Sequence, residues 1–284
     1  MSMNSLAYWD GRFEADWEPM MGTVQTRVFC ELAEALMPAW LTAQIKGRQL
    51  TLCDWGCALG DGTQVLSQTL GVSVCGVDFS RTAVDKAAQR FPQLRFLAED
   101  WSAAAGSTTY DIVFSSNTLE HFAQPWQMFA HLADHARRHV VLLLPYQEHE
   151  RIEEHEYTFD RATIPLSPQP GWVLADARIA DLGRSPVWAG KQVLLVYSRA
   201  DELAASGLTE ADCFASRLAE AAEGANPEHQ AAEIAELRRQ RDAATDQLAD
   251  LLAAHRALQA STSATVTPSA AMPWWCGIVK RWGR

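Results

Sequence analysis

Basic residues are scarce in this sequence. Its 284 residues include 24 Lys and Arg against 35 Asp and Glu, which gives a formal net charge of -11 at pH 7. Proteins that bind phosphate backbones do so through clustered Lys and Arg, so this balance argues against general nucleic-acid binding. We therefore expect no nucleic acid among the partners.

Cysteines and long apolar runs are also few. The six cysteines show no paired C-x-x-C spacing and lack the density of a secreted disulfide scaffold. No basic segment leads into an apolar core near the N-terminus, and no apolar run approaches the roughly 20 residues of a membrane span. Free thiols in a reducing compartment fit these observations, so we expect a cytoplasmic protein. With 48% hydrophobic residues, the chain can still form one sizeable core and a smaller appendage.

Two common nucleotide-binding motifs are missing from the glycine-rich segment at residues 52–63. A dinucleotide fingerprint has glycine at its first, third and sixth positions, but counted from Gly56 the third position is Ala58 and the sixth is Asp61. This spacing disfavours a nicotinamide oxidoreductase. A P-loop needs Lys followed by Ser or Thr after its last glycine, whereas Asp61 follows Gly60. Because an acidic residue there repels phosphate, the turn favours a cofactor with a carboxylate or another modest anion.

The same segment has the pattern of a strand, a tight turn and the start of a helix. Gly56 and Gly60 allow the backbone to turn sharply, and the unpaired N–H groups that begin the next helix can face a ligand. A second apolar run, residues 72–78, ends at Asp78. Its carboxylate can accept hydrogen bonds from both hydroxyls of a ribose. Together these features predict a site for a ligand with a nucleoside-like part.

Four motifs occur in the order and spacing of one protein family. They are D-x-G-C-A-x-G-D-G-T from residue 54, G-V-D-F-S from residue 76, A-E-D-W from residue 98 and D-I-V-F-S-S-N-T-L-E-H-F from residue 111. Across about residues 8–199 the chain resembles the class I S-adenosylmethionine-dependent methyltransferases. Within them it resembles the small-molecule and sugar-type proteins found with bacterial surface-polysaccharide genes. The resemblance implies methyl transfer from S-adenosyl-L-methionine to a small acceptor, with a hydroxyl of a sugar or glycan precursor as the expected acceptor.

The resemblance also implies which residues bind the cofactor. Those implied for its methionine end are Asp54, Gly56, Cys57, Ala58 and Gly60. Those implied for the nucleoside are Asp78 for the ribose, and Phe79, Asp100 and Trp101 for the adenine, while Asn117 would lie near the sulfonium and the methyl group. Ala58 departs from the family pattern, in which many members have Gly, but alanine is small enough to retain binding.

The N-terminal segment at residues 8–13 resembles the opening of such enzymes, where aromatic and basic residues fold over the cofactor. Trp9 is then a cofactor-binding residue, and Arg12 would pair with the cofactor carboxylate in a charge-assisted bond. The alternative is that Trp9 and Phe13, four residues apart, only pack one face of a helix. The sequence leaves both interpretations open.

Three titratable residues are candidates for activating an acceptor hydroxyl. Glu120 and His121 follow the fourth predicted strand, and His155 lies in a segment that resembles the H-x-x-x-F motif after the fifth strand. A sulfonium methyl group is already activated, but a positioned base helps when the acceptor is a hydroxyl. The other interpretation places both histidines in solvent, in a loop or at a helix cap.

The acidic run at residues 148–156 contains two histidines and invites comparison with a metal site. His149 and His155 are six residues apart, so they do not share one helical face as in the H-E-x-x-H motif. We therefore interpret the run as a solvated acidic loop or lid and predict no metal. Acceptor specificity is expected here and in residues 160–190, where prolines and tryptophans indicate a shaped loop region.

The hydrophobic pattern predicts an α/β fold. Strands are predicted near residues 50–55, 72–78, 94–98, 111–115 and 139–144, alternating with helices, and a late strand at residues 193–197. A preceding amphipathic helix is predicted over residues 23–42, with Val24, Val28, Leu32, Leu36 and Trp40 on one face. Together with the resemblance, this order predicts a Rossmann-like seven-stranded methyltransferase sheet with helices on both faces, over residues 1–200.

The composition changes after residue 200. Residues 201–260 have a heptad rhythm that Arg241 and His255 interrupt, which predicts a helical extension. It is either a coiled coil that makes a homodimer or a lone solvated helix. Within residues 261–284, a flexible linker is followed at residues 272–284 by three tryptophans and three basic residues. This tail fits either peripheral contact with a membrane surface or docking onto the acidic body or a partner protein.

A second class of function also fits these motifs. The nucleoside site could serve sensing or scaffolding in a non-catalytic binder, with the helical extension recruiting a partner. Cofactor binding without methyl transfer to any member of a sugar panel would favour the binder.

Overall fold

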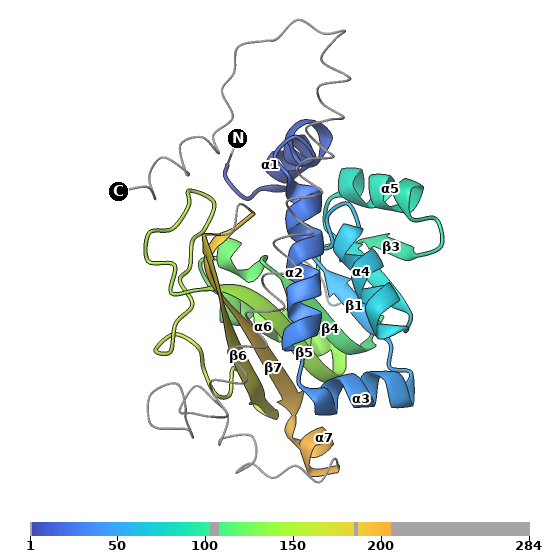
Figure 1. The fold of residues 1–284 in the computed structure, drawn as a ribbon, viewed down its shortest axis with the longest axis vertical. Coiled ribbons are helices and arrows are strands. Elements are labelled where there is room, and N and C mark those ends of the chain that lie inside the picture. Colours follow the sequence, from blue (N-terminus) through green and yellow to red (C-terminus); the bar gives the residue numbers. More distant parts are fainter. Residues whose placement is uncertain (1, 103–107, 185–186, 206–284) are drawn as a thin grey trace, which may run out of the picture. The chain divides into compact units, whose positions relative to one another are not determined.

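The apolar runs that alternate with helices form a single mixed sheet in the computed structural model, which describes residues 2–102, 108–184 and 187–205 (Figure 1). The strands are β1 Leu52–Trp55, β2 Val74–Asp78, β3 Arg95–Ala98, β4 Tyr110–Ser116, β5 Ala136–Tyr146, β6 Trp172–Arg184 and β7 Ala189–Arg199. Their order is β3-β2-β1-β4-β5-β7-β6. The first five strands pair in parallel, whereas β7 runs antiparallel to both β5 and β6.

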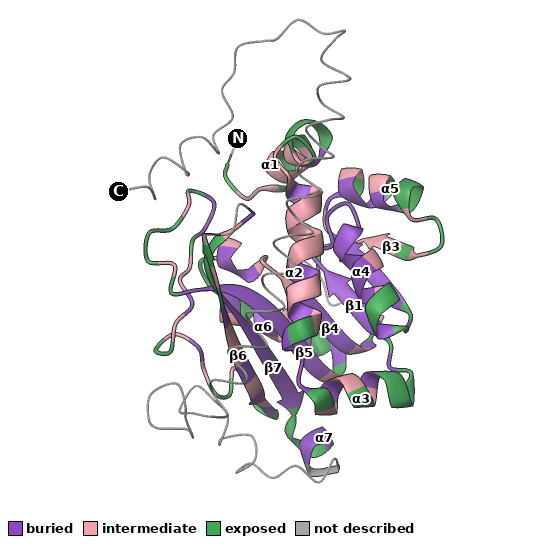
Figure 2. Cartoon of the chain, in the orientation of Figure 1, coloured by how far each residue is buried: buried purple, intermediate pink, exposed green. Residues whose placement is uncertain are grey.

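The five predicted parallel strands are all present, and the late strand at residues 193–197 lies within β7. Val140 to Leu144 in β5 are fully buried, as expected for a strand that is covered on both faces. Figure 2 shows the central strands buried along their length. The seven-stranded α/β sheet that the sequence predicts is therefore confirmed.

The strand β6 corrects the prediction of a loop region over residues 160–190. It pairs with β7 along most of its length, but the register shifts between Leu174 and Asp176. A bulge of this kind places an extra residue in one strand and interrupts the alternation of inward and outward side chains. The sequence therefore lacks the regular period of two by which a strand is recognised here.

Helices cover both faces of the sheet. They are α1 Leu6–Gly11, a π-helical turn Arg12–Asp16, α2 Gly22–Leu36, α3 Ala39–Arg48, α4 Asp61–Leu70, α5 Arg81–Arg90, a 3₁₀ turn Leu119–His121, α6 Pro125–His135 and α7 Ala200–Ala205. Leu132 and Phe129 of α6 pack with Val113 and Val140 in one core cluster. The helices α2 and α4 contact each other and lie in front of the sheet in Figure 1, whereas α6 lies behind it.

The single helix predicted over residues 23–42 is wrong, because two helices occupy this stretch. The first ends at Leu36, and Pro38 is the N-cap of the second. Met37 has extended backbone, as is favoured for a residue before proline. Of the five residues predicted to share the buried face, only Leu36 is buried. Positions spaced four apart advance about 40° beyond a full turn at each step, so such a row winds away from one face.

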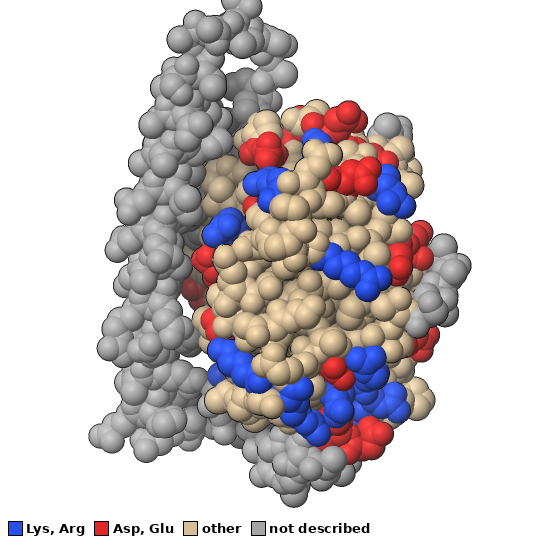
Figure 3. Space-filling view, turned by 90° about the vertical axis from the view of Figure 1, so that its right-hand side faces the viewer, with Lys and Arg blue, Asp and Glu red and all other residues tan. Residues whose placement is uncertain are grey.

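Paired charges gather where α3 and α7 lie. Basic side chains cluster at the lower end of the face drawn in Figure 3, and α3 ends in Lys46 and Arg48. Glu202 accepts hydrogen bonds from Arg48 and Arg138. Glu202 lies in α7, so these contacts attach α7 to the sheet and to α3. The folded unit therefore extends beyond residue 200, where the first predicted domain ends.

The predicted coiled coil, linker and tryptophan-rich tail lie outside the described residues, which end at residue 205. Their organisation stays a prediction. Within the described ranges, none of the helices has both the length and the apolar composition needed to cross a bilayer.

Candidate functional site

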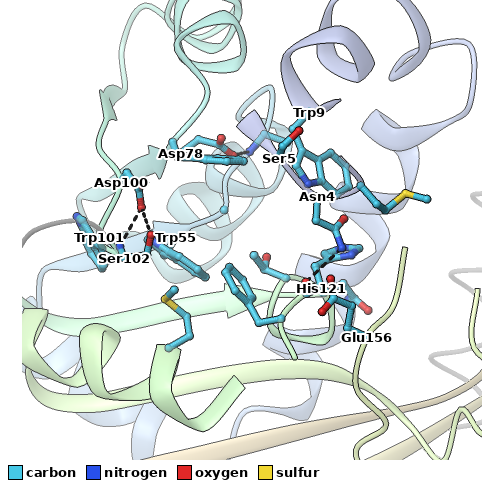
Figure 4. Close-up of a pocket in the computed structure, with 18 of the residues that line it drawn as sticks. Asn4, Ser5, Trp9, Trp55, Asp78, Asp100, Trp101, Ser102, His121 and Glu156 are labelled. Atoms are coloured by element: carbon cyan, nitrogen blue, oxygen red, sulfur yellow. Dashed lines mark hydrogen bonds between the residues drawn. The ribbon is translucent and has the colours of Figure 1, made fainter. Parts of the chain in front are cut away.

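A cavity of about 440 Å³ lies at the carboxyl ends of the parallel strands. Its walls come from the residues that follow β1, β2, β3 and β4, and from the N-terminal segment. The sheet order reverses between β1 and β4, which is where open α/β sheets bind their ligands. The predicted site residues that line this cavity are Trp9, Gly56, Ala58, Asp78, Phe79, Asp100, Trp101, Asn117 and His121. In Figure 4, Asp78, Asp100 and Trp101 lie on one side of it, and His121 and Glu156 on the other.

The turn after β1 has three residues with left-handed backbone. Gly56 has φ +80°, Ala58 has φ +48° and Gly60 has φ +81°. A Cβ atom on Gly56 would lie 2.6 Å from Oγ1 of Thr118, so glycine is required there for two reasons. Ala58 adopts a conformation that alanine rarely takes. It must therefore be held in place by its surroundings.

Asp78 provides that support. Its Oδ2 accepts a hydrogen bond from the backbone N–H of Ala58 at 3.0 Å, and its Oδ1 accepts one from the N–H of Ser80 at 2.9 Å. Burial raises the pKa of Asp78 to about 6, although these two N–H donors act in the opposite direction. Each carboxylate oxygen keeps a further lone pair. Since Asp78 also lines the cavity, it can accept hydrogen bonds from a ligand's hydroxyls.

Four predicted cofactor residues do not reach the cavity wall in the described structure. Asp54 points into the interior, where its Oδ2 accepts a hydrogen bond from Oγ1 of Thr63 at 2.6 Å, and burial raises its pKa to about 7. The Cys57 thiol is buried, and burial raises its pKa well above the ordinary range. Gly60 is the N-cap of α4, and Nη1 of Arg12 lies 3.2 Å from Sδ of Met20. Direct contact of these residues with the cofactor stays a prediction.

Aromatic rings form the wall beyond β3. Trp101 stacks on His135 with ring centroids 3.7 Å apart and planes 4° apart, and its Nε1 donates to Oε2 of Glu99 at 2.9 Å. Trp55 also lines the cavity, although no sequence motif indicated it. Its ring stacks with that of Trp101, with the ring centroids 6.4 Å apart. Asp100 is exposed, and its Oδ1 accepts hydrogen bonds from Ser102. These contacts fix a flat apolar wall with a polar edge, suited to an adenine ring.

The N-terminal segment covers the cavity. The ring of Phe13 lies between those of Trp9 and Trp17, with centroid distances of 5.8 Å and 5.0 Å. These rings pack against Ala58 and Leu59. All three aromatic residues also line the cavity. The packing of Trp9 and Phe13 against each other is therefore confirmed, whereas binding of the cofactor by Trp9 stays a prediction.

Polar contacts fasten this cover to the far side of the cavity. Nδ2 of Asn4 donates to the carbonyl oxygens of Glu154 at 2.8 Å and His121 at 3.2 Å. The Tyr8 hydroxyl donates to Oε1 of Glu154 at 2.8 Å, and the Trp9 and His121 ring centroids are 5.0 Å apart. The partners of Asn4 and Tyr8 are more than a hundred residues away in sequence, so no local motif could reveal these contacts.

The three candidate residues for acceptor activation form a cluster. Glu120 and His121 belong to the 3₁₀ turn after β4, and His155 comes from the loop after β5. The Glu120 carbonyl accepts hydrogen bonds from the N–H groups of Glu156 and Tyr157, which holds that loop against the turn. One nitrogen or oxygen from each member lies within 4.8 Å of the others. Only His121 of the three also lines the cavity.

Both histidines in this cluster have a fixed orientation. Nδ1 of His155 donates to Oε2 of Glu148 at 2.5 Å, and Nδ1 of His121 donates to the Glu154 carbonyl at 3.0 Å. The acceptors carry no proton, so each Nδ1 carries the hydrogen. His155 is only 7% exposed and Glu154 only 8%. The interpretation of His155 and of this part of the acidic run as solvated is therefore wrong, whereas His121 is partly exposed where it lines the cavity.

Burial shifts every pKa in the cluster. It raises the pKa of Glu120 to about 7, while the charge of His155 opposes the rise. It lowers the pKa of His121 to about 3, and His155 lowers it further. Burial also lowers the pKa of His155, but the hydrogen bond to Glu148 and the charge of Glu120 outweigh it and raise the pKa overall. His121 is thus a neutral imidazole whose Nε2 lone pair can accept a hydrogen bond or bind a metal ion.

Comparison with known proteins agrees with this geometry. The profile of the "Methyltransferase domain" family matches residues 53–142. A malonyl-[acyl-carrier protein] O-methyltransferase from Paenibacillus sp. (strain JDR-2) is 27% identical over 118 residues, which are 38% of this chain and 42% of that protein. The chain thus matches less than half the length of this relative.

Two solved structures of magnesium protoporphyrin IX methyltransferase from Synechocystis PCC 6803 have a similar fold. The one with bound S-adenosylhomocysteine has a TM-score of 0.52 at 20% identity, covering 68% of this chain and 97% of that chain. The one with bound S-adenosylmethionine has the same TM-score and identity, covering 70% and 99%. The family match spans β1 to Leu142 of β5, and so includes the glycine-rich turn, Asp78, Asn117 and His121. Residues 53–142 therefore match a methyltransferase domain, within a fold similar to that of these two methyltransferase structures.

Proposed function

We propose that this protein transfers the methyl group of S-adenosylmethionine to a hydroxyl oxygen of a small acceptor, a sugar or glycan precursor. The observation that carries the proposal is that Asp78 and His121 line one cavity from opposite sides (Figure 4). The first is suited to a ribose and the second to an acceptor. A cofactor bound between them would direct its methyl group toward the cluster of Glu120, His121 and His155.

The residues at the Asp78 end fit the cofactor. The cavity volume of about 440 Å³ is within the range of small-molecule sites. Asp78 would bind the ribose, while Phe79, Asp100 and Trp101 would contact the adenine. The turn at Gly56 and Ala58 would meet the methionine part, with Trp9 above it and Asn117 near the methyl group. Bound S-adenosylmethionine supplies a methyl group on a sulfonium, which is a good leaving group.

Activation of the acceptor is assigned to Glu120, His121 and His155. During transfer a carbon–oxygen bond forms while the carbon–sulfur bond breaks, and its electron pair stays on sulfur as a neutral thioether. A hydroxyl must also release its proton, on the side of the cavity where this cluster and Glu156 lie. A carboxylate acceptor has no proton to release and would need no such cluster. The buried histidine and glutamate groups therefore favour a hydroxyl.

Two further features support this choice of acceptor. The cavity is lined by Trp9, Trp17 and Trp55, and by Ser2 and Ser5 near its N-terminal cover. Aromatic faces with polar groups at their edges suit the flat apolar faces and hydroxyl rims of sugars. The name of the Paenibacillus relative specifies methylation of oxygen, which favours an oxygen acceptor but does not distinguish a hydroxyl from a carboxylate.

The test has two stages. Calorimetric titration with S-adenosylhomocysteine, and with NAD as a comparison, measures whether the site prefers the methyltransferase cofactor. Mass spectrometry of sugars, nucleotide sugars and carboxylic acids incubated with isotopically labelled donor then identifies the acceptor. We expect label on a hydroxyl, strongly reduced in His121→Asn and retained in His149→Asn, which changes an exposed histidine. Binding of S-adenosylhomocysteine without transfer to any compound would instead support the non-catalytic binder.

A further inference from the structure

Glu120 has a carboxylate without a hydrogen-bonding partner. It is 1% exposed, and neither of its side-chain oxygens makes a hydrogen bond within the described residues. The nearest basic atom is Nε2 of His155, whose 3.8 Å distance from Oε1 is too long for a hydrogen bond. A buried carboxylate in this state is costly unless a positive charge compensates for it.

The two histidines beside it place their second ring nitrogens near this carboxylate, and the one on His155 gives up its proton when a metal ion binds. Nδ1 of His155 is held by the Glu148 carboxylate, and Nδ1 of His121 by the Glu154 carbonyl. Metal-binding histidines typically have this arrangement, in which one nitrogen donates to a carboxylate or carbonyl and the other keeps its lone pair. The ligating atoms of Glu120, His121 and His155 all lie within 4.8 Å of one another.

We propose that Glu120, His121 and His155 bind a divalent transition-metal ion such as Zn²⁺. Two imidazole nitrogens and one carboxylate oxygen are the ligand set of a catalytic zinc site, which keeps an open position for water or substrate. Mg²⁺ prefers oxygen ligands throughout and does not suit this set. Because His121 and Glu156 line the cavity, the open position would face the acceptor (Figure 4).

Bound there, the ion would compensate the charge of Glu120 and polarise the acceptor oxygen. The hydroxyl oxygen would coordinate the ion, its proton would pass to the Glu156 carboxylate, and the oxygen would then form its bond to the methyl carbon as the carbon–sulfur bond breaks. This role rests on the proposed function, whereas binding of the ion does not. Spacing within residues 148–156 could not reveal the site, because two of its three ligands come from the turn after β4.

The experiment uses the full chain after removal of metal with a chelator. Co²⁺ is titrated while its visible absorption is recorded, and bound Zn²⁺ is counted by elemental mass spectrometry after dialysis. The variants Glu120→Gln and His155→Gln each remove a ligand, and Glu148→Gln removes the support of His155. The matched control is His149→Gln, because His149 lies in the same loop and is exposed. Affinity for S-adenosylhomocysteine reports whether each variant is folded.

We expect the natural chain to bind one more ion than either ligand variant, with a Co²⁺ absorption band that both variants lose and His149→Gln retains. Glu148→Gln should bind the ion about 10- to 100-fold more weakly. If the natural chain and the ligand variants bind the same amount of metal with the same spectrum, the metal site is excluded. Intact binding of S-adenosylhomocysteine in that case would leave the proposed methyl transfer standing. Metal binding without affinity for S-adenosylhomocysteine would instead overturn the proposed function alone.

Discussion

Oδ2 of Asp78 accepts a hydrogen bond from the backbone N–H of Ala58 at 3.0 Å, which joins the end of β2 to the turn after β1. The donor residue has left-handed backbone, with φ +48°. The carboxylate that we assign to the ribose therefore also holds the turn that we assign to the methionine part of the cofactor. Recognition of the two ends of the cofactor is coupled through this one side chain.

Replacing Asp78 should therefore weaken cofactor binding and loosen the turn together. For Asp78→Ala we expect affinity for S-adenosylhomocysteine to fall by about 1 to 3 kcal/mol through lost hydrogen bonds to a charged group. The free energy of unfolding should fall as well, because the Ala58 N–H loses its acceptor. Calorimetry and urea unfolding measure the two effects, with the exposed Asp134→Asn as control. Unchanged affinity would remove Asp78 from the site.

Cofactor affinity should increase with pH. Burial raises the pKa of Asp78 to about 6. Only the ionised carboxylate can accept hydrogen bonds from both ribose hydroxyls at once, so affinity for S-adenosylhomocysteine should rise from about pH 5 to about pH 7 and then level off. The same shift has the opposite effect on the free protein. Since the folded state holds this proton more tightly than the unfolded state, Asp78 lowers stability as pH rises from 3.8 to about 6.

The variant Asp78→Asn separates this effect from other titrating groups. Its affinity should be weaker at pH 7 and should vary less with pH over the same interval. An affinity in the natural protein that is constant or falls between pH 5 and pH 7 would show that ionised Asp78 does not bind the cofactor.

The turn after β1 should not tolerate a side chain at its first glycine. Gly56→Ala combines φ +80° with a Cβ atom 2.6 Å from Oγ1 of Thr118, so we expect a loss of about 1 to 3 kcal/mol of stability. A Cβ atom added to Gly47 in α3 would have no neighbour within 4 Å among the described residues, and Gly47→Ala should stabilise the protein by about 0.5 to 1 kcal/mol. Urea midpoints measure both. A Gly56→Ala protein as stable as the natural one would mean that the turn has another conformation.

Acid should remove the stabilising effect of Asp111. Burial alone would raise its pKa, but hydrogen bonds from Arg137 and Thr51 outweigh burial and hold it well below the ordinary 3.8. A lowered pKa in the folded state stabilises the protein above pH 3.8 and ceases to do so as pH falls further. Asp111→Asn should therefore cost about 1 to 3 kcal/mol at pH 7, with a smaller difference at pH 3. Urea unfolding at both pH values gives the comparison, and an equal difference at both would contradict the assignment.

Removal of residues 261–284 should leave cofactor binding intact. Among the residues that the structure describes, all that line the cavity precede residue 157, and most belong to the strand ends and the N-terminal cover. Calorimetry with S-adenosylhomocysteine should give the same affinity for the full and the shortened chain. Association with vesicles of anionic lipid should decrease if the predicted membrane contact of residues 272–284 is correct. Loss of cofactor affinity would show that the folded domain includes the tail.

Local sequence patterns indicated residues that the fold brings together around the cavity. The glycine-rich turn and Asp78 belong to short motifs whose spacing is set by one strand, one turn and one helix. Gly56, Ala58, Asp78 and Phe79 all line one cavity, and their contact with the cofactor stays a prediction. The same locality explains why the parallel strands were found, because each is an apolar run between turns.

Features that depend on distant residues could not be read from the sequence. The contacts of Tyr8 with Glu154, and of Glu120 with His155, form only when the N-terminal cover, the turn after β4 and the loop after β5 meet. Within the sequence, residues 148–156 have the composition of a solvated loop, and no local pattern pairs the other two segments with them. Burial by the fold, and not composition, gives them their chemical properties.

A crystal structure with S-adenosylhomocysteine tests the central claim most directly. The account predicts that the ribose hydroxyls lie within hydrogen-bonding distance of the Asp78 carboxylate, with the adenine against Phe79 and Trp101. The sulfur atom should then face the side of the cavity that His121 lines. Nucleoside density in another place, or a cavity that stays filled by the side chains of Trp9 and Trp17 at saturating ligand, would contradict it.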